Sequence, residues 1–430
     1  MTGTTATVVL IATASILGTP PPESFYVDVR SYLPEGFVTD GSVDYKPQIQ
    51  RCFDENLCVL FPGSDDPDRP VMYGVTAETV GKMLATRPHS RIRFGPNAVL
   101  KRLPSFGKLL RLGVGTHLTG AVVDGNKYAH WLLVKDRKVE YYAFVIGAAI
   151  VMQGRNVLRD CVVHSNAGIA FAGWHSSDNK IYRSRAENCG FLEAMNARRW
   201  TGEHASADGF FFALRSGYNL IKDCVAIDCT RWDFVPTEHV RHSTFVDCRG
   251  GDVHVQSYGF IDVESAGPGN SLVRCRSPNS RMIIQQGFQH VIGCTTSALV
   301  AEHAEHPLML ANTITGGGLR ACEVRDDRLV MPGRESPMLA GNRIFMAGAS
   351  PNHSLTVVGS DGLGTAAGNV LYGHEQDGQR STEMLLYGVG ARAGNLQTWG
   401  RWQELLEQFA RPYYLHSRMD FDFKERFDGD

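Results

Sequence analysis

Two aspartates in this chain stand inside segments that read as strands. Asp233 in RWDF and Asp252 in GGDVHVQ lie in runs that alternate polar and apolar residues, where Asp is disfavoured. Two neighbouring carboxylates can act as acid and base, or as acid and nucleophile, in glycoside hydrolysis. His254, Arg281 and Asp208 add an imidazole, a guanidinium and a third carboxylate. A base and a cation are what proton abstraction beside a uronate carboxyl group requires.

A repeated segment supplies the strands that would position these groups. Apolar and polar residues alternate within each copy, and Gly and Asn separate the copies with no helical stripe between them. Units this short cannot bury a face alone, so their recurrence at roughly 20 residues predicts stacked coils around one core. The predicted fold is all-β, a right-handed parallel β-helix. The copies are NVLRDCVV (Asn156–Val163), NKIYRSRA (Asn179–Ala186), NLIKDCVA (Asn219–Ala226), NSLVRCR (Asn270–Arg276) and QHVIGCT (Gln289–Thr295).

Outward residues at one register on successive coils would form columns, because neighbouring strands lie about 4.8 Å apart. Alternation is counted from five apolar residues taken as inward: Ile169, Phe210, Phe234, Val253 and Met282. The resulting outward columns are Asp233, Asp252 and Arg281, then Val235, His254 and Ile283, then Gln256 and Gln285. Asp208 lies one residue before the first column, beside Gly209. The predicted catalytic residues are therefore Asp233, Asp252, Asp208, His254 and Arg281.

The same face is predicted to carry an apolar platform and the walls of a cleft. Ala170 and Phe211 would offer a surface on which a sugar ring can stack. Two insertions, Phe191–Ala207 and Ser257–Gly269, exceed the basic repeat and are rich in aromatic and charged residues, as in loops that bind ligands. The predicted substrate-binding residues are Gln256, Gln285, Trp200, Tyr258, Phe211 and His204.

The ten cysteines are interpreted as interior ladders rather than as a disulfide framework or a metal site. Cys161, Ser184, Cys224, Thr244, Cys275 and Cys294 are aligned at one register, and Cys189, Cys229 and Cys248 at a second. A buried free Cys behaves as a small hydrophobe, and no CxxC pair occurs. Unpaired thiols suit folding in a reducing compartment.

The segment before the repeats, Phe25 to Ser64, predicts a strand, a turn at Asp40-Gly41 and a short helix that places Ile49, Cys52 and Phe53 on one face. The strand Cys58–Phe61 follows and ends at Pro62-Gly63. This order resembles the first segment of the pectate-lyase-like superfamily, in which a strand, a Gly-Asp-Gly turn, a short helix and a Phe-Pro-Gly strand end cap the first coil. The chain departs from that pattern at Tyr32 to Phe37, where the family usually has Phe-Gly-Ala. With the repeats, the resemblance covers most of Phe25 to about Gly373.

Three regions are predicted: a strand and helix cap at 1–64, the β-helix at 65–390, and a helical cap with an acidic tail at 391–430. Trp402, Leu405, Leu406 and Phe409 have the spacing of an amphipathic helix, and Thr398 is a suitable N-cap. Such a helix would cover the edge strands of the last coil.

Composition limits the partners. Lys+Arg number 43 against Asp+Glu 45, and no basic run interleaves with aromatics, so no nucleic-acid partner is expected. Thr5 to Gly18 is apolar, but no Lys or Arg precedes Arg30, and the stretch is shorter than a membrane span. We therefore favour a strand or cap over a signal peptide and expect no membrane partner. An extracellular or virion-associated location is favoured, because the resemblance includes phage tailspikes.

Three functions fit these observations. The favoured one is hydrolysis of a polysaccharide by paired carboxylates on the β-helix face, with no cofactor and no metal site. The second is a polysaccharide lyase in which Arg281 and His254 act in β-elimination, where the resemblance allows aspartate-bound calcium. The third is a non-catalytic glycan-binding tailspike or adhesin. Because tailspikes are usually trimers, the resemblance makes a homotrimer one assembly to test.

Overall fold

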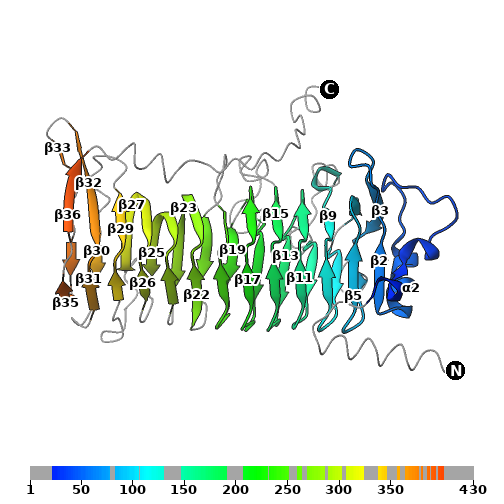
Figure 1. Cartoon of the computed structure of the whole chain (residues 1–430), viewed down its shortest axis with the longest axis horizontal. Coiled ribbons are helices and arrows are strands. Elements are labelled where there is room, and N and C mark those ends of the chain that lie inside the picture. The colour runs from blue at the N-terminus through cyan, green and yellow to red at the C-terminus, as the bar shows by residue number, and fades with distance from the viewer. Residues whose placement is uncertain are drawn as a thin grey trace, which may run out of the picture.

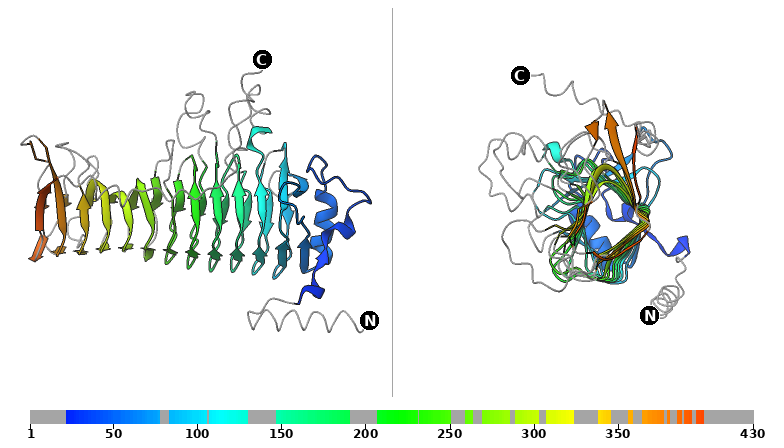
Figure 2. Two further views of the ribbon diagram at one scale, coloured as in Figure 1. Left: turned by 45° about the horizontal axis from the view of Figure 1, so that its top comes forward. Right: turned by 90° about the vertical axis from the view of Figure 1, so that its left-hand side faces the viewer.

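The computed structural model describes residues 22–77, 83–105, 107–129, 147–190, 207–230, 232–250, 259–263, 269–285, 289–302, 307–323, 338–345, 356–358, 364–376, 379–380, 385–387, 389–393 and 396–400. Within these residues the strands form three sheets of 14, 16 and 6 strands, called the first, second and third sheets. Figure 1 shows the strands of successive coils side by side along one axis, and the right panel of Figure 2 shows the coil end-on. The described strands pair in parallel, except β32 with β33.

The first sheet contains β1 (Val27–Asp28), β2 (Cys58–Phe61), β5 (Arg91–Phe94), β8 (His117–Thr119), β11 (Val157–Arg159), β14 (Lys180–Tyr182), β17 (Leu220–Lys222), β20 (Thr244–Val246), β22 (Asn270–Val273), β24 (Gln289–Ile292), β26 (Leu308–Leu310), β28 (Met338–Ala340), β31 (Gly364–Ala367) and β35 (Val389–Ala393). The third sheet contains β3 (Val71–Thr76), β6 (Ala98–Leu103), β9 (Val122–Asp124), β12 (Val162–His164), β15 (Arg185–Glu187) and β18 (Val225–Ile227).

The second sheet contains β4 (Leu84–Ala85), β7 (Leu110–Leu112), β10 (Ile150–Met152), β13 (Phe171–Trp174), β16 (Phe210–Ala213), β19 (Trp232–Pro236), β21 (Gly259–Val263), β23 (Arg276–Gln285), β25 (Thr295–Glu302), β27 (Thr313–Glu323), β29 (Arg343–Phe345), β30 (Thr356–Val358), β32 (Val370–Gln376), β33 (Gln379–Arg380), β34 (Leu385–Tyr387) and β36 (Leu396–Gly400). In three consecutive coils, one long strand (β23, β25 or β27) replaces the separate third-sheet and second-sheet strands of earlier coils, and the pairing between these long strands contains register shifts.

The core runs along the axis because each short strand turns one apolar residue inward. In the first sheet this residue is the middle one, and it is buried in coil after coil. The inward residues are Val59, Ile92, Leu118, Leu158, Ile181, Ile221, Phe245, Leu272, Val291, Met309 and Leu339. The predicted period-2 burial is confirmed on these strands.

Two-residue corners join first-sheet strands to the segment that follows, which is a third-sheet strand in the early coils and a second-sheet strand from β23 onward. The first corner residue is left-handed in coil after coil, with φ between 45° and 68° at Gly120, Asp160, Arg183, Asp223, Asp247, Arg274, Gly293, Ala311, Gly341 and Gly368. Aspartate and glycine tolerate this backbone well, so the aspartates of the repeat serve the turn. The second corner residue points inward and forms the ladder that the sequence predicts.

The ladder differs from the prediction at one rung. Strand β20 pairs Val246 with Lys222, so Cys248 stacks above Cys224, and the predicted Thr244 lies on the outer side of its strand. The alignment failed there because coil length varies, from 23 residues between Cys161 and Ser184 to 40 between Ser184 and Cys224. Nine cysteines in the described residues are free and buried.

The helix of the N-terminal cap agrees with its prediction, whereas the apolar stretch Thr5 to Gly18 lies outside the described residues. Helix α2 (Lys46–Glu55) buries Ile49, Cys52 and Phe53, while the short 3-10 helices η1 (Glu23–Phe25) and η2 (Val29–Tyr32) precede it. At the other end, Thr398 lies inside β36 and is not a helix N-cap. Parallel pairing of β36 with β32 carries the coil to Gly400, beyond residue 390. The predicted helix at Trp402 to Phe409 lies outside the described residues.

The described helices are too short and too polar to cross a membrane.

His117 on the first sheet gives the fold a testable pH dependence. Burial, with the charges of Arg91, Arg159 and His89, lowers the pKa of His117 to about 4. Between pH 6.5 and 4 the unfolded chain therefore binds a proton that the folded chain excludes, so stability present above pH 6.5 is lost as pH falls. We expect the free energy of unfolding to drop by about 2 kcal/mol over this window, allowing for partial exposure. Denaturant titrations of His117→Gln should show a flatter pH profile, and an unchanged slope would contradict the assignment.

Candidate functional site

Asp233 lies on the inner side of the coil. Phe234 pairs with Phe210, so Asp233 takes the position that Gly209, Ala170 and Ala149 hold on earlier coils. Ala149 and Ala170 belong to the core, and Asp233 is fully buried. The pKa of the Cys229 thiol is raised by its hydrogen bond with Cys189, by burial and by the charges of Asp233 and Asp208. The predicted outward orientation of Asp233 is wrong, because the residue before each inward phenylalanine also faces inward at this corner.

Asp208 has a structural role in the described residues. It is 2% exposed, and its Oδ1 accepts the backbone N–H of Trp232 at 3.2 Å. Trp232 is the first residue of β19, so Asp208 holds the start of the strand on the next coil. A carboxylate so buried and so bonded does not contact a substrate on the outer face.

The register gives the position beside Asp233 to a residue other than the predicted Asp252. Strand β21 pairs Gly259 with Trp232 and Ile261 with Phe234, so Phe260 takes the position beside Asp233. Ile261, and not Val253, continues the column of Phe210 and Phe234. The predicted insertion Ser257–Gly269 therefore contains a strand of the second sheet.

The remaining predicted residues divide into two groups. Arg281 and Gln285 lie in β23, with Arg281 in the column of Asp233 and Phe260 and Gln285 in register with Glu302, but their side chains lie outside the described part. Asp252, His254, Gln256, Trp200, His204 and Tyr258 lie wholly outside the described residues. Their roles stay predictions.

An apolar surface covers the outer face of the second sheet. Phe211 lies outward there, in register with Ala172 and Val235, and Val151 lies beside Ala172. The predicted neighbour Ala170 belongs to the core, so Ala172 takes its place beside Phe211. We call this surface the outer apolar face; its residues are Val151, Ile169, Ala172, Trp174, Phe211, Trp232 and Val235.

Trp174 and Phe211 are the accessible part of the outer apolar face. Both are half-buried, whereas Ala172, Val235 and Trp232 are 0%, 1% and 6% exposed. The two rings lie 5.8 Å apart with a 52° tilt, and the Lys108 ammonium sits 4.2 Å from the Trp174 ring centre. Burial and the charge of Arg111 lower the pKa of Lys108. Trp174 was not predicted, because the sequence analysis aligned Ile169, and not Phe171, with Phe210 of the next coil. This two-residue shift placed Ala170 instead of Ala172 beside Phe211.

The register adds one carboxylate to the column of the outer apolar face. Because Phe234 pairs with Ile261, the next residues, Val235 and Asp262, share a register, and Asp262 pairs with Ile283. Asp262 thus holds the position that the sequence analysis gave to His254. The signal was present in the sequence GFIDV, whose Ile261 and Asp262 repeat the apolar pair Phe234 and Val235 one coil later, but the segment had been assigned to an insertion.

A polar column lies on the outer face of the third sheet. Asp124, His164 and Glu187 occupy one register on β9, β12 and β15. The His164 Nδ1 and the Asp124 Oδ1 are 3.9 Å apart, with side chains 25% and 22% exposed, and Arg185 pairs with Glu187. Burial lowers the pKa of His164, although Asp124 opposes this, so the imidazole is neutral near pH 7 and can accept a proton. Sequence alignment did not find this cluster.

The described residues contain no group of three His, Cys, Asp or Glu side chains placed to hold a metal ion.

Comparisons with known proteins identify the fold. A similar solved structure is that of the pre-mature bacteriophage phi29 gene product 12, with a TM-score of 0.50, 14% identity, and coverage of 86% of this chain and 51% of that one. The chain is a right-handed parallel β-helix. This β-helix is also similar to an exopolygalacturonase from Thermotoga maritima (TM-score 0.49, 11% identity, 91% of this chain, 95% of that one) and to the Azotobacter vinelandii mannuronan C-5 epimerase AlgE6 A-module (0.48, 14%, 87%, 100%). No family model and no curated protein matches the sequence.

The β-helix explains how both surfaces arise. Parallel strands of consecutive coils keep the same register, so residues 20 to 40 positions apart in the chain become neighbours in a column. The outer apolar face and the polar column lie on strands that follow one another in the chain, since β9, β12 and β15 of the third sheet precede β10, β13 and β16 of the second.

Proposed function

We propose that this β-helix binds a polysaccharide against the outer apolar face and cleaves its glycosidic bonds there. The observation that carries the proposal is the half-buried pair Trp174 and Phe211 on the outside of the coil. The aliphatic faces of sugar rings pack on aromatic side chains, and these two rings are the accessible part of the outer apolar face. A linear glycan along the axis would contact consecutive coils.

Hydrolysis needs an acid and a second carboxylate beside the bound sugar. Asp233 and Asp208 are unsuited because both are buried and Asp208 caps a strand. Asp262 replaces them in the proposal, since it shares the column of Phe211 and Val235. Asp252 is retained as the second carboxylate.

A second candidate reaction is β-elimination at the polar column. A neutral His164 could remove the proton next to a uronate carboxyl group, and Arg185 could hold the developing negative charge. The lowered pKa of His164 and its position between two carboxylate-bearing strands favour this reading. Lyase activity would then fall as pH drops and His164 takes up a proton.

The binding proposal predicts the effect of truncating the two aromatic side chains. In a panel of neutral and acidic polysaccharides, Phe211→Ala and Trp174→Ala should each weaken binding by about tenfold, since one ring contact is worth roughly 1 kcal/mol or more. Tyr218→Ala is the matched control, because Tyr218 is a 54% exposed aromatic on a turn. Equal losses in all three variants, or none in the first two, would contradict the proposal.

The two reactions differ in their products. New reducing ends without absorbance from unsaturated uronates indicate hydrolysis, which Asp262→Asn should abolish and His164→Gln should spare. Reducing ends with that absorbance indicate elimination, and the effects of the two variants should then be reversed. Binding without either signal would reduce the protein to a glycan-binding module.

A further inference from the structure

The outer face of the first sheet gathers positive charge that is scattered in the sequence. Register aligns Arg93, Thr119, Arg159, Tyr182 and Lys222 in one column across β5, β8, β11, β14 and β17. A parallel column on the same strands holds Arg91, His117, Val157, Lys180 and Leu220. These outward positions contain no Asp or Glu. The five strands, side by side in Figure 1, therefore form a basic face within a chain of net charge −2.

Three cations of the basic face are available to a partner. Arg159 and Lys180 are exposed and Lys222 is half-buried, and in the part of the chain that the structure describes none of them forms an ion pair. Arg159 instead lies over the Tyr182 ring, 4.6 Å from its centre. Tyr182 lies on the next coil, one strand spacing from Arg159, and its ring holds the guanidinium on the surface.

One aspartate at the corner after the basic face, and a second one coil beyond its last strand, are paired with arginines. At the adjacent corner, Arg183 binds Asp160 through two hydrogen bonds of 2.7 and 2.8 Å, and Arg274 binds Asp247 through two of 2.8 and 2.7 Å. These pairs lie in the turns and do not involve Arg159, Lys180 or Lys222. The excess positive charge therefore runs along the axis of the coil.

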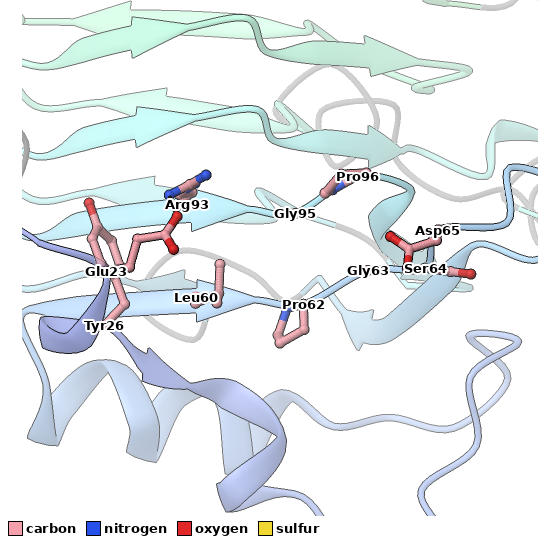
Figure 3. Close-up of a pocket in the computed structure, with 10 residues that line it drawn as sticks. All are labelled: Glu23, Tyr26, Leu60, Pro62, Gly63, Ser64, Asp65, Arg93, Gly95 and Pro96. Atoms are coloured by element: carbon pink, nitrogen blue, oxygen red, sulfur yellow. Dashed lines mark hydrogen bonds and ion pairs between the residues drawn. The ribbon is translucent and has the colours of Figure 1, made fainter.

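A pocket of about 300 Å³ opens at the cap end of the basic face. Figure 3 shows Tyr26, Glu23 and Arg93 at one end, Leu60 and Pro62 in the middle, and Ser64 and Asp65 at the other end. Leu60 and Arg93 belong to the column that continues to Arg159 and Lys222. The pocket combines apolar surface with hydrogen-bonding groups, and its Arg93–Glu23 pair (2.6 Å) is exposed.

We propose that the basic face is a second polymer-binding surface, which holds an acidic polysaccharide along the axis with one sugar unit in the pocket. The cations recur coil by coil in a line, which suits a linear chain with regularly spaced negative groups. Phe94 of β5 is buried and the Tyr182 ring is covered by Arg159, so stacked nucleobases would find no open phenyl or phenol ring on these strands. Carboxylate and sulfate groups would both satisfy the cations.

The test compares two variants that remove equal charge. Arg159→Gln/Lys180→Gln/Lys222→Gln removes the three available cations of the basic face. Arg51→Gln/Arg69→Gln/Arg215→Gln removes three exposed cations elsewhere and is the matched control. Calorimetric titration with polygalacturonate, dextran sulfate, neutral dextran and single-stranded DNA, each at two salt concentrations, gives affinity and salt dependence.

We expect binding of polygalacturonate or dextran sulfate, whichever carries the preferred anion, and no binding of neutral dextran. The face variant should raise Kd by about tenfold or more and flatten the salt dependence, because fewer counterions are released, whereas the control should stay within about twofold. Equal losses in both variants, an unchanged face variant, absence of polyanion binding, or DNA binding as tight as that of the glycans would overturn the proposal. The comparison is repeated in a Phe211→Ala/Trp174→Ala background, which removes the two rings of the outer apolar face. The same difference between face variant and control is expected there, so the basic face is tested separately from glycan cleavage on the second sheet.

Discussion

Replacing Phe210 by alanine is expected to destabilise the β-helix by about 3–5 kcal/mol, the usual loss for a buried phenylalanine. Phe210 is fully buried between Phe171 and Phe234, with ring centres 4.7 and 4.9 Å away and planes within 5° of parallel. These separations equal the spacing of parallel strands, so the backbone register holds the rings in an offset stack. Truncating the middle ring leaves a cavity and breaks both contacts. Denaturant unfolding followed by circular dichroism measures the loss.

The neighbouring residue provides the control for this prediction. Phe211 has the same side chain on the same strand but points outward and is half-buried. Phe211→Ala should therefore lower the free energy of unfolding far less than Phe210→Ala, while it weakens glycan binding. If the two variants were equally stable, the inward and outward assignments on β16 would be wrong.

The fold was predictable because its signals are local. The alternation within NVLRDCVV and its relatives sets which residues of each first-sheet strand face inward, and Leu158, Ile181 and Ile221 are buried as that pattern requires. Helix α2 was likewise readable from the spacing of Ile49, Cys52 and Phe53. Each of these inferences uses residues within one turn or strand of each other.

The site was harder to predict because it depends on register between coils. Asp233, Asp252 and Arg281 form a column only if each coil starts its second-sheet strand at the residue assumed. The coil that follows Asp233 instead places Gly259–Val263 in the sheet. Two consecutive inward residues at the corner, such as Ala170 and Phe171, also break the alternation count. Coil length and corner geometry are set by tertiary packing, so a sequence repeat alone did not determine them.

A second substitution with a large expected effect on stability lies in the asparagine ladder, the column of Asn156, Asn179 and Asn219 that hydrogen-bonds successive coils. Asn179 is fully buried; its Oδ1 accepts the Asn156 N–H at 3.1 Å, and its Nδ2 donates to Ser176 Oγ and Asn219 Oδ1, both at 2.8 Å. Asn179→Ala would leave the buried Asn156 N–H without this acceptor and remove two further bonds. Because an unsatisfied buried donor costs about 1–3 kcal/mol and each lost bond adds to it, we expect a loss of about 3 kcal/mol in chemical denaturation.

Two further substitutions separate hydrogen bonding from volume. Ser243 holds this column position two coils later and accepts the Asn219 N–H at 3.3 Å, so Asn179→Ser should keep part of the ladder and cost less than alanine. Asn179→Asp keeps an acceptor for Asn156 but sets a buried carboxylate against the Asn219 Oδ1, which raises the pKa of the new group. The free energy of unfolding of this variant is then greatest below about pH 4, the pKa of the new carboxyl group in the unfolded chain, and falls as pH rises. This is the reverse of the His117 effect. If Asn179→Ala and Asn179→Ser were equally stable, or if Asn179→Asp showed no loss toward neutral pH, the coils would be held by side-chain volume at this corner and not by the hydrogen-bonded ladder.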